Sequence, residues 1–161
     1  MGKEVDLKFV GELEVFQFGY VYKDIEKQAK MMEEIWGMPK FAVLPPNTSE
    51  VIYRGMNSTY TIKIAFTRYF GKQIELIEWI SGEGIHKEFL DNGNEGFQHI
   101  SCRVEDLDKY VKKLGQKGME PVHLGHIGKQ NFAYFDTEDT LGFLLELQST
   151  EKKKRKKNKT P

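Results

Sequence analysis

Two similar segments in the sequence begin the two halves of the chain. The first reads FQFGYVYKDIEK from Phe16 to Lys27, and the second reads QHISCRVEDLDK from Gln98 to Lys109. When the stretches DIEK and DLDK are aligned, Gln17 falls opposite His99, seven residues before the aspartate in each segment. A repeat of this kind predicts two structural units of the same type, and neither unit can bury its apolar sheet face alone. The two units are therefore expected to pack together.

The downstream parts of the two halves also resemble each other. Gly37-Met38-Pro39 corresponds to Gly118-Met119-Glu120-Pro121, and Ile74-Glu75-Leu76 corresponds to Leu145-Glu146-Leu147. Each half thus carries a polar residue on its first predicted strand and a glutamate on its last. Pseudo-twofold packing would bring these four residues into one site, which consists of Gln17, Glu75, His99 and Glu146.

The residue pattern predicts an α+β fold of two tandem βαβββ modules that form a curved mixed sheet around a cleft. The modules span about residues 14–80 and 96–149. In the first module, strands are expected at 15–22, 41–44, 60–70 and 73–80, a helix capped by Asp24 ends at Gly37, and 47–58 is a loop or hairpin. A short helix at 85–90 connects the modules. In the second module, strands are expected at 97–104, 121–127, 131–135 and 142–148, with a helix at 106–116.

Length and composition favour a single globular domain over residues 1–149. The chain has 161 residues, of which 39% are hydrophobic and 30% are charged, and no apolar run is long enough to span a membrane. The N-terminus lacks the pattern of a signal peptide, so we expect a cytoplasmic protein without a membrane partner. Cys102 is the only cysteine, which excludes a disulfide framework, and the strand pattern turns it away from His99.

Residues 150–161 form a basic tail. They carry seven basic residues and one acid, so the remainder of this formally neutral chain is acidic. One interpretation is an electrostatic tether to nucleic acid or anionic lipid. The interpretation we prefer is a disordered, solvated end, because no aromatic residue interleaves the lysines. A nucleic-acid partner is therefore not expected.

Glu75 and Glu146 lie within apolar strand sequences. A buried carboxylate is unfavourable unless it is paired or bound to a cation. Two glutamates, one histidine and one glutamine amide would offer a divalent ion three or four ligands and leave positions for water or substrate. The alternative is simple alternation, in which each glutamate lies on a solvent-exposed strand face and Gln17 and His99 are satisfied within the core. The symmetry of the four positions favours the metal site.

The chain resembles the vicinal oxygen chelate superfamily, which includes glyoxalase I, methylmalonyl-CoA epimerase, extradiol dioxygenases and metal-dependent resistance proteins. The resemblance covers nearly all of residues 15–148. Its most specific part is GIHKEFLDNGNEGFQHISCRVEDLD, residues 84–108, which is similar to an epimerase segment in which a short helix and a glycine-rich turn lead into a His-Ile strand. Glu75 and Glu146 stand at the positions of two family metal ligands.

The resemblance implies a divalent metal ion, namely zinc, nickel, cobalt or manganese, bound by Gln17, Glu75, His99 and Glu146. In this order the four residue types resemble the metal set of eukaryotic glyoxalase I. However, that enzyme holds glutathione with an arginine and an asparagine where this chain has Val21 and Trp79. Extradiol dioxygenases would require a histidine in place of Gln17. A dioxygenase activity is therefore less favoured than the other activities of the superfamily.

The activity implied by the resemblance is that of an isomerase, epimerase or lyase that works through an enolate next to a carbonyl. Glu146 and Glu75 would be the catalytic bases, and His99 would be a neutral ligand. The substrate would be a small molecule such as an acyl-CoA or a 2-oxo compound, and family analogy adds a homodimer. The rival hypothesis is a non-catalytic binding or resistance protein with the same fold.

The other histidines and the arginines are not expected to bind the metal ion. The pattern places His86 on the exposed side of the short helix, and His123 and His126 at the surface or at the rim of the cleft. Arg54, Arg68 and Arg103 are equal candidates for contacting a carboxylate or phosphate of the substrate.

Overall fold

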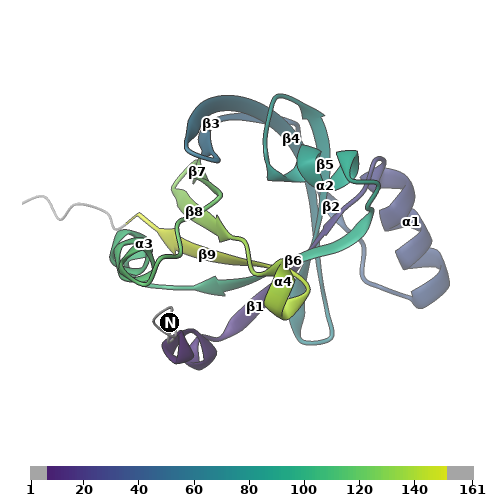
Figure 1. Cartoon of the computed structure of the whole chain (residues 1–161). Coiled ribbons are helices and arrows are strands. Elements are labelled where there is room, and N and C mark those ends of the chain that lie inside the picture. The colour runs from purple at the N-terminus through teal and green to yellow at the C-terminus, as the bar shows by residue number, and fades with distance from the viewer. Residues whose placement is uncertain (1–6, 152–161) are drawn as a thin grey trace, which may run out of the picture.

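The computed structural model describes residues 7–151 (Figure 1). The first half contains η1 (Lys8–Glu12), β1 (Val15–Val21), α1 (Ile25–Trp36), β2 (Ala42–Val43), β3 (Asn47–Tyr53), β4 (Met56–Tyr69) and β5 (Lys72–Ser81). The second half contains α2 (Ile85–Asp91), β6 (Gly96–Arg103), α3 (Leu107–Gln116), β7 (His123–Ile127), β8 (Gln130–Phe135), α4 (Glu138–Leu141) and β9 (Leu144–Thr150). The sequence did not predict η1 or α4. The region 47–58 forms a hairpin, in which β3 pairs with the start of β4.

The repeated DIEK and DLDK stretches start the two long helices in the same way. The Asp24 side chain accepts a hydrogen bond from the Lys27 backbone N–H, and the Asp106 side chain accepts one from the Lys109 N–H. Each aspartate thereby satisfies a backbone donor that the first helical turn leaves unpaired. Gly37 ends α1 with a φ of 64°, in the left-handed region that glycine adopts readily.

The nine strands form one sheet, and eight of them close into a barrel. In the first half β1 pairs with β5 in parallel, β5 pairs with β4 and β4 pairs with β3, while the short β2 also pairs with β4. In the second half β6 pairs with β9 in parallel, β9 with β8, and β8 with β7. The antiparallel pairs β1–β6 and β3–β7 join the two halves. The strands thus curve around in a ring, with α1 and α3 on opposite outer sides (Figure 1).

The barrel closure differs from the predicted curved sheet around a cleft. Tyr53, Ile52 and Val51 of β3 pair with His123, Leu124 and Gly125 of β7, and this short seam joins the ends of the curved sheet. A Cβ atom at Gly125 would lie 2.9 Å from Val51 Cγ1, so glycine permits the close approach of the two strands. The site therefore lies inside a barrel.

Strand alternation separates an interior core from two exterior cores. Ile77, Phe132 and Tyr134 point into the barrel, whereas their strand neighbours pack outside against helices. The exterior cluster beneath α1 includes Ile25, Ala29 and Leu76, and the cluster beneath α3 includes Leu107, Leu114 and Cys102. Cys102 is buried in that outer cluster, as predicted, on the side of the sheet away from the barrel interior.

The last strand, β9, ends at Thr150 rather than at the predicted residue 148. The Glu151 backbone N–H donates to the Lys129 carbonyl oxygen. Of the predicted basic tail, 150–161, residues 152–161 lie outside the described residues. Between residues 7 and 151, no helix has the length and apolar character required to cross a membrane.

Candidate metal centre

The structure brings together three of the four predicted site residues in the barrel interior. Glu75 of β5, His99 of β6 and Glu146 of β9 are all buried. His99 Nε2 lies 3.3 Å from Glu75 Oε2 and 3.4 Å from Glu146 Oε2. One potential ligand atom from each residue lies within 4.8 Å of the others. These residues come from distant parts of the sequence, and the neighbouring strands β9, β6, β1 and β5 hold them in register.

A glycine on β1 makes room for the histidine. Gly19 pairs with His99 on one side and with Glu75 on the other. A Cβ atom at position 19 would lie 1.9 Å from His99 Cε1 and 2.1 Å from His99 Nε2. The imidazole therefore occupies the space that any larger residue at position 19 would fill. The sequence predicted the strand but gave no indication of this role for Gly19.

Gln17, the fourth predicted residue, is buried beside the same group within a network of amides. The Gln17 side-chain N–H donates to Gln73 Oε1 at 2.8 Å. Gln148 Nε2 lies 2.9 Å from Glu146 Oε2 and 3.4 Å from Gln17 Oε1, so one amide contacts both predicted ligands. Gln148 and Gln73 were not predicted as site residues, although each stands two positions from a site glutamate on the same strand face.

Gln98 fixes the orientation of the His99 ring. Its Oε1 lies 3.0 Å from His99 Nδ1, and its Nε2 donates to the Ile85 carbonyl oxygen at 3.3 Å. Because an amide oxygen only accepts, Nδ1 carries the proton in this contact, and in the neutral ring Nε2 then presents its lone pair. His99 Nε2 is fully buried and has no well-aligned hydrogen bond within residues 7–151. A lone pair directed at two carboxylates is the arrangement expected of a metal ligand.

Burial and mutual interaction shift the protonation of this cluster. Burial lowers the pKa of His99, but the interactions with Glu146 and Glu75 outweigh that effect and raise it from 6.5 to about 9. Burial raises the pKa of Glu75, and the neighbouring His99 opposes the rise. Without a cation, the cluster thus retains a proton at neutral pH that balances part of its negative charge.

We expect the metal-free protein to lose stability as the pH rises from 6.5 to about 9, the interval between the ordinary and the shifted pKa of His99. A pKa that is raised by folding stabilises the folded state below the unfolded value, and this contribution disappears as the pH passes the folded value. The raised pKa of Glu75 acts in the same direction. Melting temperatures of the chelator-treated protein measure the effect. A wild-type melting temperature that stays constant over this interval would contradict the raised pKa of His99.

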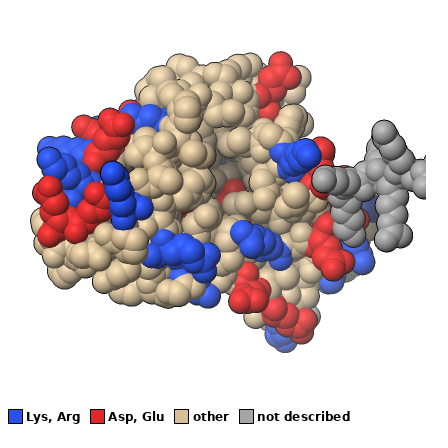
Figure 2. All heavy atoms as spheres, turned by 180° about the vertical axis from the view of Figure 1, so that it is seen from behind, with Lys and Arg blue, Asp and Glu red and all other residues tan. Residues whose placement is uncertain are grey.

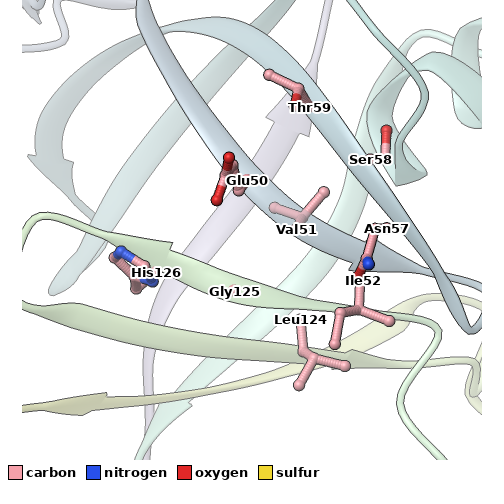
Figure 3. A pocket seen from close by; sticks show the side chains of 9 residues that line it. All are labelled: Glu50, Val51, Ile52, Asn57, Ser58, Thr59, Leu124, Gly125 and His126. Atoms are coloured by element: carbon pink, nitrogen blue, oxygen red, sulfur yellow. The ribbon is translucent and has the colours of Figure 1, made fainter.

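Glu75 and Glu146 lie in the wall of an interior cavity of about 300 Å³, whereas the fully buried His99 lies behind that wall and does not line the cavity. Exposed or half-buried residues such as Phe16, Leu44 and Arg103 line its mouth, and the buried Tyr60 and His86 line its inner end. Figure 2 shows a hollow near the centre of one face, with acidic atoms at its bottom. A larger groove of about 530 Å³ between the β3–β4 hairpin and β7 includes Glu50 and His126 but no residue of the Glu–His–Glu group (Figure 3).

Two histidines lie where the sequence did not place them. His86 was predicted to be exposed and His123 to be at the surface or rim, but both side chains are fully buried. His86 stacks on Tyr60, and His123 Nδ1 accepts a hydrogen bond from the Ile85 backbone N–H. The reason is that α2 packs across one end of the barrel and turns His86 inward. His126 is exposed, in agreement with the prediction.

The buried histidines and tyrosines at the inner end are uncharged at neutral pH. Burial lowers the pKa of His123 to about 4 and that of His86 well below 6.5. Burial also raises the pKa of Tyr60 and Tyr134, and the nearby glutamates contribute to the increase. The inner end of the cavity therefore adds no charge to the Glu–His–Glu group.

Comparisons with known proteins agree with this architecture. Residues 16–135 match the sequence model of a family described as the glyoxalase/bleomycin resistance protein/dioxygenase superfamily. No curated protein matches the sequence.

Solved structures with a similar fold include a hypothetical protein from Bacillus halodurans, with 17% identity, a TM-score of 0.61, and coverage of 88% of this chain and 96% of that one. Methylmalonyl-CoA epimerase from Mycobacterium tuberculosis has 21% identity, a TM-score of 0.60, and coverage of 86% and 88%. The Streptomyces coelicolor methylmalonyl-CoA epimerase in complex with 2-nitronate-propionyl-CoA has 16% identity, a TM-score of 0.58, and coverage of 86% and 94%. At these identities the likeness concerns the fold.

Proposed function

Because the chain belongs to the glyoxalase/bleomycin resistance protein/dioxygenase superfamily, we propose that it is a metal-dependent isomerase, epimerase or lyase that moves a proton next to a carbonyl. The observation that carries the proposal is the buried His99 Nε2, which has no well-aligned hydrogen bond and lies 3.3 Å and 3.4 Å from two carboxylates. An uncompensated pair of buried carboxylates is unfavourable, and a divalent cation would neutralise it.

The residues present fit such an ion. Glu75, His99 and Glu146 would hold it, and Gln17 would provide an amide oxygen once Gln148 yields its weak contact at 3.4 Å. A mixed set of carboxylate, imidazole and amide ligands suits zinc, nickel, cobalt or manganese. When bound, the cation would supply Lewis-acid polarisation of a carbonyl oxygen and so favour the enolate.

The carboxylates supply the proton chemistry of the proposal. We assign Glu146 as the main base that removes the proton next to the carbonyl, with Glu75 acting on the other face of the planar enolate. Gln148 holds Glu146 Oε2 by a hydrogen bond of 2.9 Å, which orients the carboxylate. His99 is not assigned a role in proton transfer, because its Nδ1–H faces Gln98 and its Nε2 faces the two glutamates. The apolar barrel wall keeps bulk water from the enolate.

The proposed substrate is a small molecule with an acyl-CoA or 2-oxo group. The methylmalonyl-CoA epimerases of similar fold support the acyl-CoA choice, since one is in complex with methylmalonyl-CoA and another with 2-nitronate-propionyl-CoA. A cavity of about 300 Å³ is at the small end of ligand sites and would hold an acyl group rather than a whole coenzyme. In this arrangement the coenzyme part would lie outside the mouth.

The domain organisation and the oligomeric state of the protein also belong to the proposal. We infer that residues 1–149 form one domain of two tandem βαβββ modules, which is supported by the equal order of strand pairings in the two halves. We also propose a homodimer by family resemblance. Light scattering should then give twice the chain mass of 18.7 kDa.

The activity is tested by hydrogen exchange at the α-carbon. The protein loaded in turn with zinc, nickel, cobalt or manganese is incubated in D₂O with methylmalonyl-CoA, and deuterium incorporation is followed by mass spectrometry. We expect at least one metal form to accelerate exchange and the chelator-treated protein to lose the acceleration. The same assay on the hemithioacetal of a 2-oxoaldehyde tests the 2-oxo branch. If metal-loaded protein binds these compounds but exchanges no proton, the non-catalytic binding protein is the better description.

A further inference from the structure

A positively charged group stands at the mouth of the cavity. Arg103, the last residue of β6, is the one lysine or arginine among the described residues that line it. Its guanidinium carbon lies 4.1 Å from the ring centroid of Phe16, another mouth residue, which steadies the long side chain. Arg103 forms no ion pair with a carboxylate between residues 7 and 151.

The structure distinguishes the three arginines that were equal candidates for contacting a carboxylate or phosphate of the substrate. Arg54 forms hydrogen bonds to both carboxylate oxygens of Glu88 through its Nε and Nη2 atoms, so its charge is already paired. Arg68 is exposed and does not line the cavity. Only Arg103 combines a place on the cavity wall with a charge that lacks an acidic partner in the described chain.

The other polar groups at the mouth are also free to donate. Gln73 Oε1 accepts from Gln17, and Gln130 Oε1 accepts from the Thr150 hydroxyl. Both amides line the cavity, and their NH₂ groups have no hydrogen-bond partner within residues 7–151. The mouth therefore presents a guanidinium and two amide donors, which is the chemistry that recognises an oxyanion.

The balance of charge points to one anionic group on the ligand. This step rests on the proposed function, in which a divalent cation compensates Glu75 and Glu146 while Gln17 and His99 are neutral. The positive charge of Arg103 is then the uncompensated charge of the cavity. Between the mouth and the inner end the wall is apolar and includes Ile62, Ile64 and Phe132, which suits a hydrocarbon chain.

We propose that Arg103 determines specificity by binding a carboxylate of the substrate at the mouth while the carbonyl of the same molecule reaches Glu75 and Glu146 in the cavity wall. The substrate class is thus a carbonyl compound that carries a separate anionic oxygen group and has an apolar segment between the two. A phosphate ester shares this anion chemistry, and the experiment below distinguishes it from a carboxylate.

The test uses two probes with the same 4-oxopentanoyl skeleton, the anion 4-oxopentanoate and its uncharged methyl ester. Dissociation constants are measured by ligand-observed NMR on the full chain, both metal-loaded and chelator-treated. The wild type should bind the acid at least about tenfold more tightly than the ester, because hydrogen bonds to charged groups are the stronger ones. Arg103→Met keeps the aliphatic stem and should bring the two constants within about twofold. Arg68→Met is the matched control and should behave as the wild type.

The measured preference for the acid over the ester decides whether Arg103 binds the anion. A preference for the acid that survives in Arg103→Met, or that is missing in the wild type, overturns the inference. Preference that depends on Arg103 in a protein that binds no metal supports the anion site while refuting the proposed metal-dependent function. Inorganic phosphate is titrated in parallel, and its displacement of 4-oxopentanoate from the wild type but not from Arg103→Met would identify a phosphate as an equally acceptable anion for this site. Melting curves establish that both variants are folded.

Discussion

Replacing Gly19 with alanine is expected to disrupt the proposed metal centre although none of its ligands is substituted. The new Cβ atom would lie 1.9 to 2.4 Å from three atoms of the His99 ring. The backbone at position 19 cannot retreat, because β1 is paired with β5 on one side and with β6 on the other. His99 must therefore leave the two glutamates. We expect metal affinity to fall by more than about 100-fold, beyond the range of outer-shell changes, and stability to fall by about 1–3 kcal/mol from overpacking.

Gly11 provides the matched control for this substitution. It lies in η1, and a Cβ atom there would meet nothing within 4 Å. Gly11→Ala should therefore retain the metal affinity of the wild type, as measured by competition with a chelating dye. If Gly19→Ala binds metal as tightly as Gly11→Ala, His99 is not a ligand in the position that the structure gives it.

Substituting Glu146 with glutamine is expected to lower the rate of α-proton exchange by about 10²–10⁴-fold, the usual contribution of a positioned general base. Glutamine has nearly the shape of glutamate but cannot accept a proton at neutral pH, and it can still face Gln148. Exchange is measured in D₂O at saturating metal, with metal content determined on the same sample. This separates the loss of the base from the loss of the ion.

Glu50→Gln is the control for Glu146→Gln, because Glu50 lies on exposed β3 at the groove outside the barrel. It should exchange protons at the rate of the wild type. A Glu146→Gln variant that retains metal and also exchanges at the rate of the wild type would remove Glu146 from the proton transfer and transfer the assignment to Glu75.

The local structure could be read from the sequence wherever adjacent residues determine it. The aspartates that begin DIEK and DLDK cap helices because their side chains reach backbone donors three residues ahead. Glu75 and Glu146 turn inward because they alternate with outward apolar residues that pack beneath α1 and α3. The juxtaposition of Glu75, His99 and Glu146 followed from the repeat, which related positions far apart in the chain.

Features that depend on long-range packing could not be read in this way. The burial of His86 depends on how α2 crosses the end of the barrel, and that of His123 depends on the β3–β7 seam. Neither contact has a local pattern. The roles of Gly19 and Gln98 depend on the position of one imidazole ring. The Arg103 side chain could be distinguished from Arg54 only after the structure showed that Glu88 pairs with Arg54.

The most direct test of the account is the metal content of the purified, tag-free protein, measured by elemental analysis beside alanine variants of Gln17, Glu75, His99 and Glu146. We predict one divalent ion per chain in the wild type, bound at purification or after addition of zinc, nickel, cobalt or manganese. The ion should be lost in the Glu75, His99 and Glu146 variants and held more weakly in the Gln17 variant. A folded wild-type protein that binds none of these metals would contradict the central claim.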